Sequence, residues 1–258
     1  EMVDSRLKLG RCTALFSATL SPPSYYKTVL GCDSPQEVTH SYALPSPFDP
    51  QNLCLLICPQ INTRWAAREE SLVPIARLLF AMVSAKSGNY LAYFPSYQYL
   101  QMEAETFSKL YPQVELLLQS PEMDDSQREQ FLRRFDNPHP DAPLLAFAVL
   151  GGIYSEGVDL KGEKLLGSAI IGTGLPKVGA QQEILRDYYQ EKNQMGYDFA
   201  YRYPGMNKVL QAAGRVIRSD SDRGVVMLLD DRFAAPSYRR LFPAHWAQAR
   251  CIFSQEEL

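Results

Sequence analysis

Short apolar segments alternate with segments of helical periodicity along most of this chain, and the alternation limits the folds open to it. Apolar, β-prone runs predict buried strands at residues 52–58, 90–94, 114–118, 144–149, 165–171 and 224–229. Between these runs, apolar residues recur at helical spacing at residues 66–85, 98–110, 126–135 and 206–218. Strands that alternate with helices form βαβ units, so we expect an α/β fold with a mostly parallel sheet covered by helices on both faces. Ligands of such a sheet bind at the loops that follow the carboxyl ends of its strands.

The N-terminal part of the chain follows a different pattern. Residues 12–16 form another short β-prone run, which predicts a strand that ends in the polar turn at residues 17–23. Residues 34–50 contain several prolines, which oppose regular structure and predict a linker. The chain begins at Glu1 within a charged, periodic stretch and without an initiator Met, which is typical of a piece of a longer protein.

The composition is that of an ordinary globular protein and narrows the function classes only slightly. With 46% hydrophobic and 21% charged residues, the 258-residue chain has enough apolar material for a core, so disorder is not expected. The formal net charge is −3, so a nucleic-acid contact would have to come from a local groove. The five cysteines lack the spacing of a metal site, which predicts reduced thiols. Without a membrane-length apolar run or a signal-peptide pattern, we expect a cytoplasmic protein with no membrane partner.

The segment Gln211-Ala-Ala-Gly-Arg-Val-Ile-Arg218 is the strongest functional signal. On a helix, Gln211, Arg215 and Arg218 would project from one face, because residues three and four apart are neighbours. Two guanidinium groups beside an amide suit a polyanion such as a triphosphate. From the spacing alone, a surface helix with ion pairs to Asp220 and Asp222 explains the segment equally well.

A second signal is the glycine-containing segment at residues 151–159, which follows the predicted strand 144–149. Glycines at the end of a strand permit tight turns, and Glu156 and Asp159 could accept hydrogen bonds from ribose hydroxyls or orient an arginine. Taken alone, such a segment is more often an ordinary turn. The phosphate-binding pattern Gly-x-x-x-x-Gly-Lys-Ser/Thr is absent from the whole sequence, so no segment can hold a triphosphate by itself.

Together these segments resemble a known family. Residues 17–22, 93–97, 155–160 and 211–218 resemble, in that order, motifs III, IV, V and VI of the XPD/DinG group of superfamily 2 DNA helicases. The resemblance extends from about Arg11 to Trp246, and motif VI is its most specific part. It implies a RecA-like fold and three regions: the end of a first motor lobe at 1–23, a linker at 24–50, and a second RecA-like domain at 51–258.

The resemblance also implies how the chain would work. In this family ATP binds between two lobes, and the first lobe supplies the phosphate-binding loop and the acidic residues for Mg²⁺. ATP and Mg²⁺ would therefore be held mainly by the N-terminal motor lobe of the same polypeptide, which would be a partner of this domain. An iron–sulfur cluster could lie in that part, but the cysteines of this chain do not reproduce its ligand spacing.

Each motif residue receives a role from the resemblance. Arg218 would be the arginine finger, Arg215 would reach the triphosphate, and Gln211 would sense the γ-phosphate or the attacking water. Asp159 and Gly157 would lie at the nucleotide, and Glu156 would link nucleotide state to the DNA-facing loop. A helix-cap carboxylate is the alternative role for Glu156.

For single-stranded DNA, the resemblance implies contacts on strand-end loops. Ser96 would bind a phosphate, Tyr93 or Tyr97 would stack on a base, and Tyr154 and Thr173 would face the same groove. Core packing is the alternative for each tyrosine taken singly. Two functions remain open: half of a helicase motor, or a RecA-like interaction module that hydrolyses nothing. A free-standing nucleotide hydrolase is excluded because no phosphate loop could hold a triphosphate beside Mg²⁺.

Overall fold

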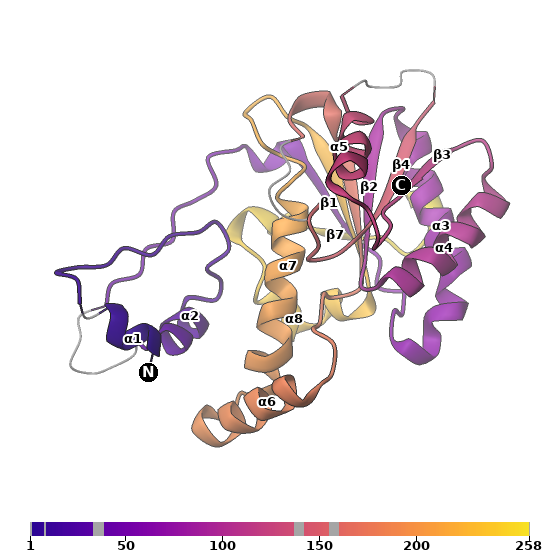
Figure 1. Ribbon diagram of the computed structural model, residues 1–258. Coiled ribbons are helices and arrows are strands. Elements are labelled where there is room, and N and C mark those ends of the chain that lie inside the picture. The colour runs from indigo at the N-terminus through magenta and orange to yellow at the C-terminus, as the bar shows by residue number, and fades with distance from the viewer. Residues whose placement is uncertain (1, 8, 33–38, 137–141, 155–159, 258) are drawn as a thin grey trace. The chain divides into compact units, whose positions relative to one another are not determined.

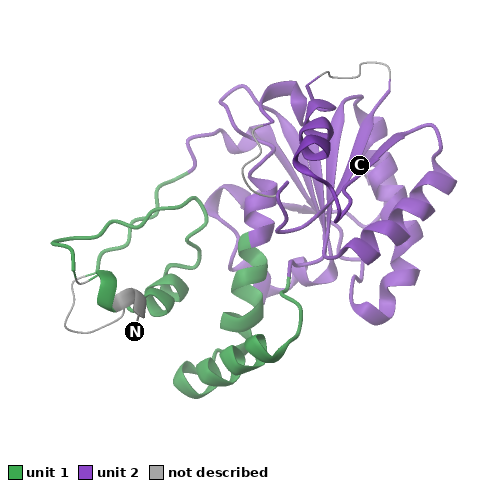
Figure 2. Cartoon of the chain, viewed as in Figure 1, with its two compact units in different colours: residues 1–45, 175–207 green, residues 46–174, 208–258 purple. Residues whose placement is uncertain are grey.

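The computed structural model describes residues 2–7, 9–32, 39–136, 142–154 and 160–257. The chain divides into two compact units (Figure 2). The first unit comprises residues 1–45 and 175–207, and the second comprises residues 46–174 and 208–258. The region boundaries at residues 23 and 50 that follow from the family resemblance stay a prediction.

The second unit contains a seven-stranded sheet in the order β3-β4-β2-β5-β6-β1-β7, and all of its neighbouring strands are parallel (Figure 1). The strands are β1 (Leu53–Ile57), β2 (Asn89–Phe94), β3 (Glu115–Leu118), β4 (Leu144–Val149), β5 (Gly167–Ile171), β6 (Gly224–Leu229) and β7 (Arg250–Cys251). The prediction of a parallel α/β sheet is confirmed, and each predicted strand from residue 52 onward is present. All strands end at one edge of the sheet, which we call the carboxyl edge.

Both faces of the sheet are buried. On β2, Tyr90 and Phe94 pack on one face with helices α3 (Arg68–Ala85) and α4 (Tyr97–Leu110), which lie together on one side of the sheet in Figure 1. Leu91 and Tyr93 alternate with them and are 2% and 0% exposed. Because neither face of the central strands β2 and β5 (Gly167–Ile171) meets water, most of their positions are apolar, and they appear in the sequence as near-continuous apolar runs.

The remaining elements are short or lie partly in the first unit. The second unit also contains α5 (Asp125–Arg133) and α8 (Pro236–Arg239). Helix α7 (Tyr203–Ala213) begins in the first unit and ends in the second. Short 3₁₀ turns occupy Pro50–Asn52, Trp65–Ala67, Gly162–Lys164, Asp231–Ala234, Ala244–Trp246 and Gln255–Glu257. No helix among the described residues is both long and apolar enough to cross a bilayer.

The first unit contains α1 (Met2–Leu7), α2 (Pro23–Leu30), α6 (Ala180–Asn193) and a π-helical turn at Asp198–Arg202. Aromatic rings join its distant segments, because the ring of Tyr25 lies 5.1 Å from that of Phe199 and 5.3 Å from that of Tyr203. The Asn207 side-chain amide also donates to the hydroxyl of Tyr26 at 2.7 Å.

The predicted strand at residues 12–16 is wrong. These residues form no regular structure, and Phe16 is 93% exposed. A strand requires a neighbour with which to share backbone hydrogen bonds, and no described strand pairs with this segment. β propensity alone therefore does not produce a strand here.

Candidate nucleotide and nucleic-acid site

The segment that carries Gln211, Arg215 and Arg218 is only partly helical. Helix α7 ends at Ala213, so the prediction that these three side chains share one helical face is wrong. Gly214 follows the helix. The next two backbone amides donate to carbonyls three residues earlier in the chain: Arg215 N–H donates to Ala212 O and Val216 N–H to Ala213 O, both at 3.3 Å. Glycine has a low helix propensity and favours such an ending. Gln211 and Arg215 are half-buried, and Arg218 is exposed beyond the helix.

A buried carboxylate holds the backbone of this segment. Asp222 is 4% exposed and accepts hydrogen bonds from Arg218 N–H at 2.7 Å, Ser219 N–H at 2.8 Å, the Ser219 hydroxyl at 2.6 Å and Gly162 N–H at 3.1 Å. Burial by itself raises the pKa of Asp222, but these hydrogen bonds outweigh it and hold the pKa below its usual value. One of the two explanations left open by the sequence paired Asp222 with an arginine side chain. In the structure the carboxylate instead fixes the main chain that carries Arg218 and ties it to Gly162.

Arg215 lies close to the end of β2. Burial raises the pKa of the Tyr93 hydroxyl, and the positive charge of Arg215 acts in the opposite direction. The same hydroxyl donates to Tyr154 O at 3.0 Å, on the loop that follows β4. Residues from motif IV, motif VI and the start of the motif V loop thus meet within the second unit.

Tyr93 and Tyr154 are core residues, so neither the predicted stacking of Tyr93 on a base nor the predicted position of Tyr154 at the DNA groove fits the structure. Tyr93 is 0% exposed and Tyr154 is 2% exposed. The Tyr154 ring stacks on Phe131 with 4.3 Å between ring centroids, and its hydroxyl contacts Met123 Sδ at 3.6 Å. Neither ring offers a face to a base.

The other predicted DNA contacts lie at the carboxyl edge. Ser96 caps α4, where its Oγ accepts from Tyr99 N–H at 3.3 Å and its own O–H can still donate. Tyr97 is half-buried, and its hydroxyl accepts from the side-chain amide of Gln119 at 2.9 Å. Thr173 is 1% exposed, and its hydroxyl has no hydrogen-bond partner among the described residues.

Gln119 is a positioning residue that the sequence did not reveal. Its amide oxygen accepts from Val149 N–H at 2.8 Å while its amide nitrogen holds Tyr97. One side chain therefore connects the end of β4 with the motif IV loop. Its signal in the sequence is only a polar residue directly after β3.

The motif V residues Glu156, Gly157 and Asp159 lie outside the described part of the chain, so their roles stay predictions. The start of that loop is described at Gly151, whose φ of +77° favours glycine. A Cβ at this position would lie 2.8 Å from Lys208 Cδ on α7, so the absence of a side chain lets the loop approach the helix.

A second polar cluster lies at the ends of β6 and β1. The carboxylate of Asp230 is bound by Arg232 at 2.6 and 2.8 Å and by the hydroxyl of Thr63. Burial would raise the pKa of Asp230, but the bonds from Arg232, its charge and the Thr63 bond hold the pKa below its usual value. Next to it, Arg64 Nη1 donates to both carboxylate oxygens of Asp231, at 2.8 and 2.9 Å. The cluster fixes the loop that follows β1.

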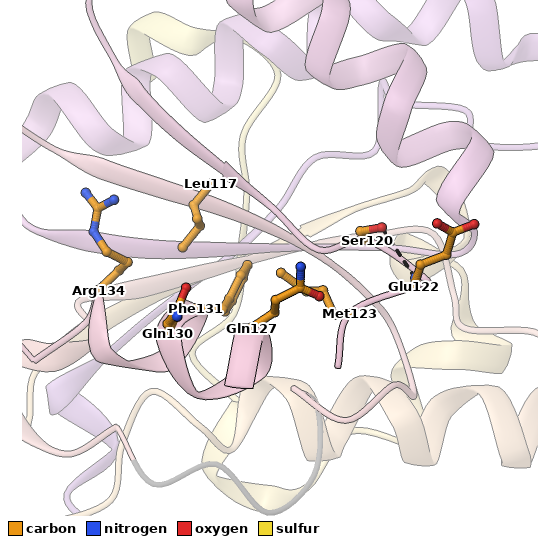
Figure 3. Close-up of a pocket in the computed structure, with 8 residues that line it drawn as sticks. All are labelled: Leu117, Ser120, Glu122, Met123, Gln127, Gln130, Phe131 and Arg134. Carbon is orange, nitrogen blue, oxygen red and sulfur yellow. Dashed lines mark hydrogen bonds between the residues drawn. The ribbon is translucent and has the colours of Figure 1, made fainter. Parts of the chain in front are cut away.

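A cavity of about 460 Å³ lies between β3 and α5, and none of its lining residues is a predicted site residue (Figure 3). Its wall combines apolar and polar side chains: Leu117, Ser120, Glu122, Met123, Gln127, Gln130, Phe131 and Arg134. Within the described residues, no three His, Cys, Asp or Glu side chains gather as a metal site would require.

Comparisons with known proteins bear on the family and the fold of the chain. A family model described as "Helicase C-terminal domain" matches residues 79–249. The ATP-dependent DNA helicase chl1 of Schizosaccharomyces pombe is 23% identical over 90% of this chain and 30% of its own length. The ATP-dependent DNA helicase YoaA of Escherichia coli is 27% identical over 81% of this chain and 31% of its own length. The chain thus spans about a third of the length of these relatives.

The fold is also found in a solved structure. An apo structure of XPD superposes with a TM-score of 0.68 at 20% identity, covering 92% of this chain and 47% of the XPD chain. The expected RecA-like fold is confirmed.

Proposed function

Because the chain belongs to the helicase C-terminal domain family, in the XPD/DinG group of superfamily 2, we propose that it is the second motor domain of an ATP-dependent DNA helicase. It would complete an ATP site whose other wall is a first motor lobe. The phosphate-binding pattern is absent from its sequence, so this domain contributes to phosphate chemistry only through side chains that reach across to a triphosphate held elsewhere.

The observation that carries the proposal is that the backbone of Arg218 is held by hydrogen bonds. Asp222 fixes its backbone, while its side chain projects from an exposed position just beyond α7. A guanidinium on a fixed main chain can neutralise the charge that develops on a transferred phosphoryl without a reorganisation cost. Arg215, half-buried beside Tyr93, would contact the triphosphate from the same turn, and Gln211 would meet the γ-phosphate from the last turn of α7.

The carboxyl edge would bind the single strand. Ser96 retains a hydroxyl donor for a phosphate and Tyr97 is partly exposed, whereas Thr173 is 1% exposed, so its predicted DNA contact does not fit the described structure. Phosphate contacts position a strand and carry no sequence preference. Glu156, Gly157 and Asp159 keep their proposed places at the nucleotide, and Mg²⁺ would be held by acidic residues of the first lobe.

The test uses a polypeptide that contains both lobes. Arg218→Ala should lower single-stranded-DNA-stimulated ATP turnover by about three orders of magnitude and leave DNA affinity within a few-fold, because it removes a contact made in the transition state. Arg223→Ala is the matched control, since Arg223 is an exposed arginine in the same turn region.

Equal turnover in the Arg218 variant and the control would refute the role of Arg218. Normal DNA binding without any ATP turnover in the parent polypeptide would instead support the non-hydrolysing interaction module.

A further inference from the structure

Trp65 is a large aromatic side chain that the functional motifs do not include. It follows the loop after β1 and is 72% exposed, whereas the other tryptophan, Trp246, is 3% exposed. The guanidinium carbon of Arg68 lies 4.9 Å from the centroid of the Trp65 ring and also 4.9 Å from the centroid of the Tyr99 ring. One face of the indole thus rests on a cation, and its exposure leaves the other face to solvent.

Arg68 is itself held in place. The Tyr99 ring is 0% exposed, and its hydroxyl is hydrogen-bonded to that of Ser71. No carboxylate in the described part of the chain lies within ion-pair distance of Arg68. Burial lowers the pKa of this guanidinium, as expected for a half-buried cation without a counter-charge. Two rings compensate the charge by cation–π contact and Arg68 Nε donates to Thr63 O at 3.5 Å, and these contacts fix the indole plane.

The loop that carries Trp65 is rigid. Asp231 N–H donates to Ile61 O at 2.8 Å, and Thr63 is anchored on Asp230. Asn62 Oδ1 accepts from the backbone N–H and the guanidinium of Arg64, at 3.1 and 3.0 Å. An aromatic side chain on such a support loses little conformational freedom when a ligand stacks on it.

The sheet order places Trp65 on the same edge as the proposed strand contacts. Along the carboxyl edge, β4, β2, β5, β6 and β1 end in that sequence. The loop after β2 carries Ser96 and Tyr97, the loop after β5 carries Thr173, and the loop after β1 leads to Trp65. Neighbouring strands are about 4.8 Å apart, so the ends of β2 and β1 are separated by roughly 14 Å along the edge.

We propose that Trp65 is a base-stacking platform for single-stranded nucleic acid, at the end of a path along the carboxyl edge that begins at Ser96. This inference rests on the proposed function. The open indole face receives a base, as aromatic residues do in proteins that bind single strands without sequence preference. The cation–π contact of Arg68 holds the indole from the opposite face, so the open face stays available to the base.

Intrinsic fluorescence tests the proposal directly, because Trp65 is the exposed tryptophan and Trp246 is in the core. Fluorescence of the 258-residue chain is followed while oligo(dT) is added, and binding of a dye-labelled oligo(dT) is measured in parallel by anisotropy. We expect saturable quenching in the unchanged chain and none in Trp65→Leu. Anisotropy should show that Trp65→Leu binds about tenfold more weakly and Trp65→Phe within about threefold of the unchanged chain.

The salt dependence separates stacking from charge. Trp65→Leu should weaken binding by a similar factor at each salt concentration, because no phosphate contact is removed. Thermal unfolding of both variants checks that the exposed substitution leaves the fold intact.

The outcomes distinguish this inference from the function on which it rests. Oligo(dT) binding by anisotropy with unchanged affinity in Trp65→Leu, or with quenching retained in that variant, overturns the stacking role and leaves strand binding intact. The absence of oligo(dT) binding at low salt overturns the stacking role, while the Arg218 comparison in the two-lobe polypeptide decides the proposed motor function separately. Quenching by thymidine monophosphate or ATP as strong as by oligo(dT) overturns the strand path and assigns Trp65 to a free nucleotide. Quenching by oligo(dT) alone, with the tenfold loss in Trp65→Leu, supports the proposal.

Discussion

Glu103 is a carboxyl group buried in the core of the second unit. It lies in α4 and is 0% exposed, and neither of its oxygens has a hydrogen-bond partner among the described residues. Burial raises its pKa from 4.5 to about 9, because the charged form loses its hydration. The folded protein therefore keeps Glu103 protonated at neutral pH, which makes the stability of the second unit depend on pH.

The sign and size of this effect follow from the two pKa values. The unfolded chain releases the proton near pH 4.5, whereas the folded chain holds it up to about pH 9. The contribution of Glu103 to stability is fully present below pH 4.5 and declines by about 1.4 kcal/mol per pH unit as the pH rises through this window. At pH 7 the decline amounts to roughly 3 kcal/mol.

The assay is urea unfolding followed by circular dichroism from pH 5 to pH 8, on the unchanged chain and on Glu103→Gln. Glutamine has nearly the same shape and does not titrate, so the variant should gain about 1.4 kcal/mol over the unchanged chain with each pH unit. Glu105→Gln is the matched control, because Glu105 lies on the exposed face of the same helix. A difference between Glu103→Gln and the unchanged chain that stays constant from pH 5 to pH 8 would refute the reasoning.

Two further predictions concern the motor. The purified 258-residue chain should release no phosphate from ATP, with or without single-stranded DNA, because its sequence has no phosphate-binding loop; DNA-stimulated release would contradict this. Asp222→Ala should lower the free energy of unfolding at pH 7 by about 3 kcal/mol, because it strips the charged acceptor from four donors. The folded pKa of Asp222 is depressed, so this contribution is present above about pH 4 and is lost as the pH falls through the folded value. In urea unfolding, an equal gap between variant and unchanged chain at pH 7 and pH 3 would count against it.

The sheet could be predicted from the sequence because burial on both faces leaves an unambiguous signal. β4 was expected at residues 144–149 and occupies Leu144–Val149, since every one of its residues is apolar. β7 could not be found, because Arg250–Cys251 is too short for any periodicity. The run at residues 12–16 has the same composition as a strand, but pairing depends on a neighbour that composition does not reveal.

The end of α7 shows a different limit. Apolar residues continue at helical spacing from Val209 through Ala213 to Val216, and Val216 is 1% exposed. Its Cγ1 lies only 2.4 Å from where a Cβ of Gly224 would be, so the glycine makes room for it. The periodicity therefore predicts correctly that Val216 is buried. It does not predict that the helix ends before Val216, because the spacing of apolar residues says nothing of the backbone conformation that buries them.

The sequence predicts which residue types form the candidate site, but it does not predict which side chains hold the backbone of that site in place. The motif segments identify Arg215 and Arg218 by residue type and order. Asp222 and Gln119 act instead on backbone N–H groups far away in the sequence, those of Gly162 and Val149. A backbone group has no residue-type signature, so only the fold reveals these contacts. The tyrosines show the same limit, because Tyr93 and Tyr97 read alike in the sequence but only Tyr97 is partly exposed.

Asp222 provides a main-chain connection between motifs V and VI. The prediction assigned the coupling of nucleotide state to the DNA-facing loop to Glu156, with Tyr154 on the DNA side of the same loop, but the Tyr154 ring is buried against Phe131. Asp222 joins Gly162, just after motif V, to Arg218 at the end of motif VI through hydrogen bonds to both main chains. A shift at Gly162 therefore acts on the bonds that hold the Arg218 backbone. Because a guanidinium stabilises a transferring phosphoryl only within hydrogen-bond reach, we expect the placement of Arg218 to follow the main chain at Gly162 more closely than the side-chain charge at Glu156.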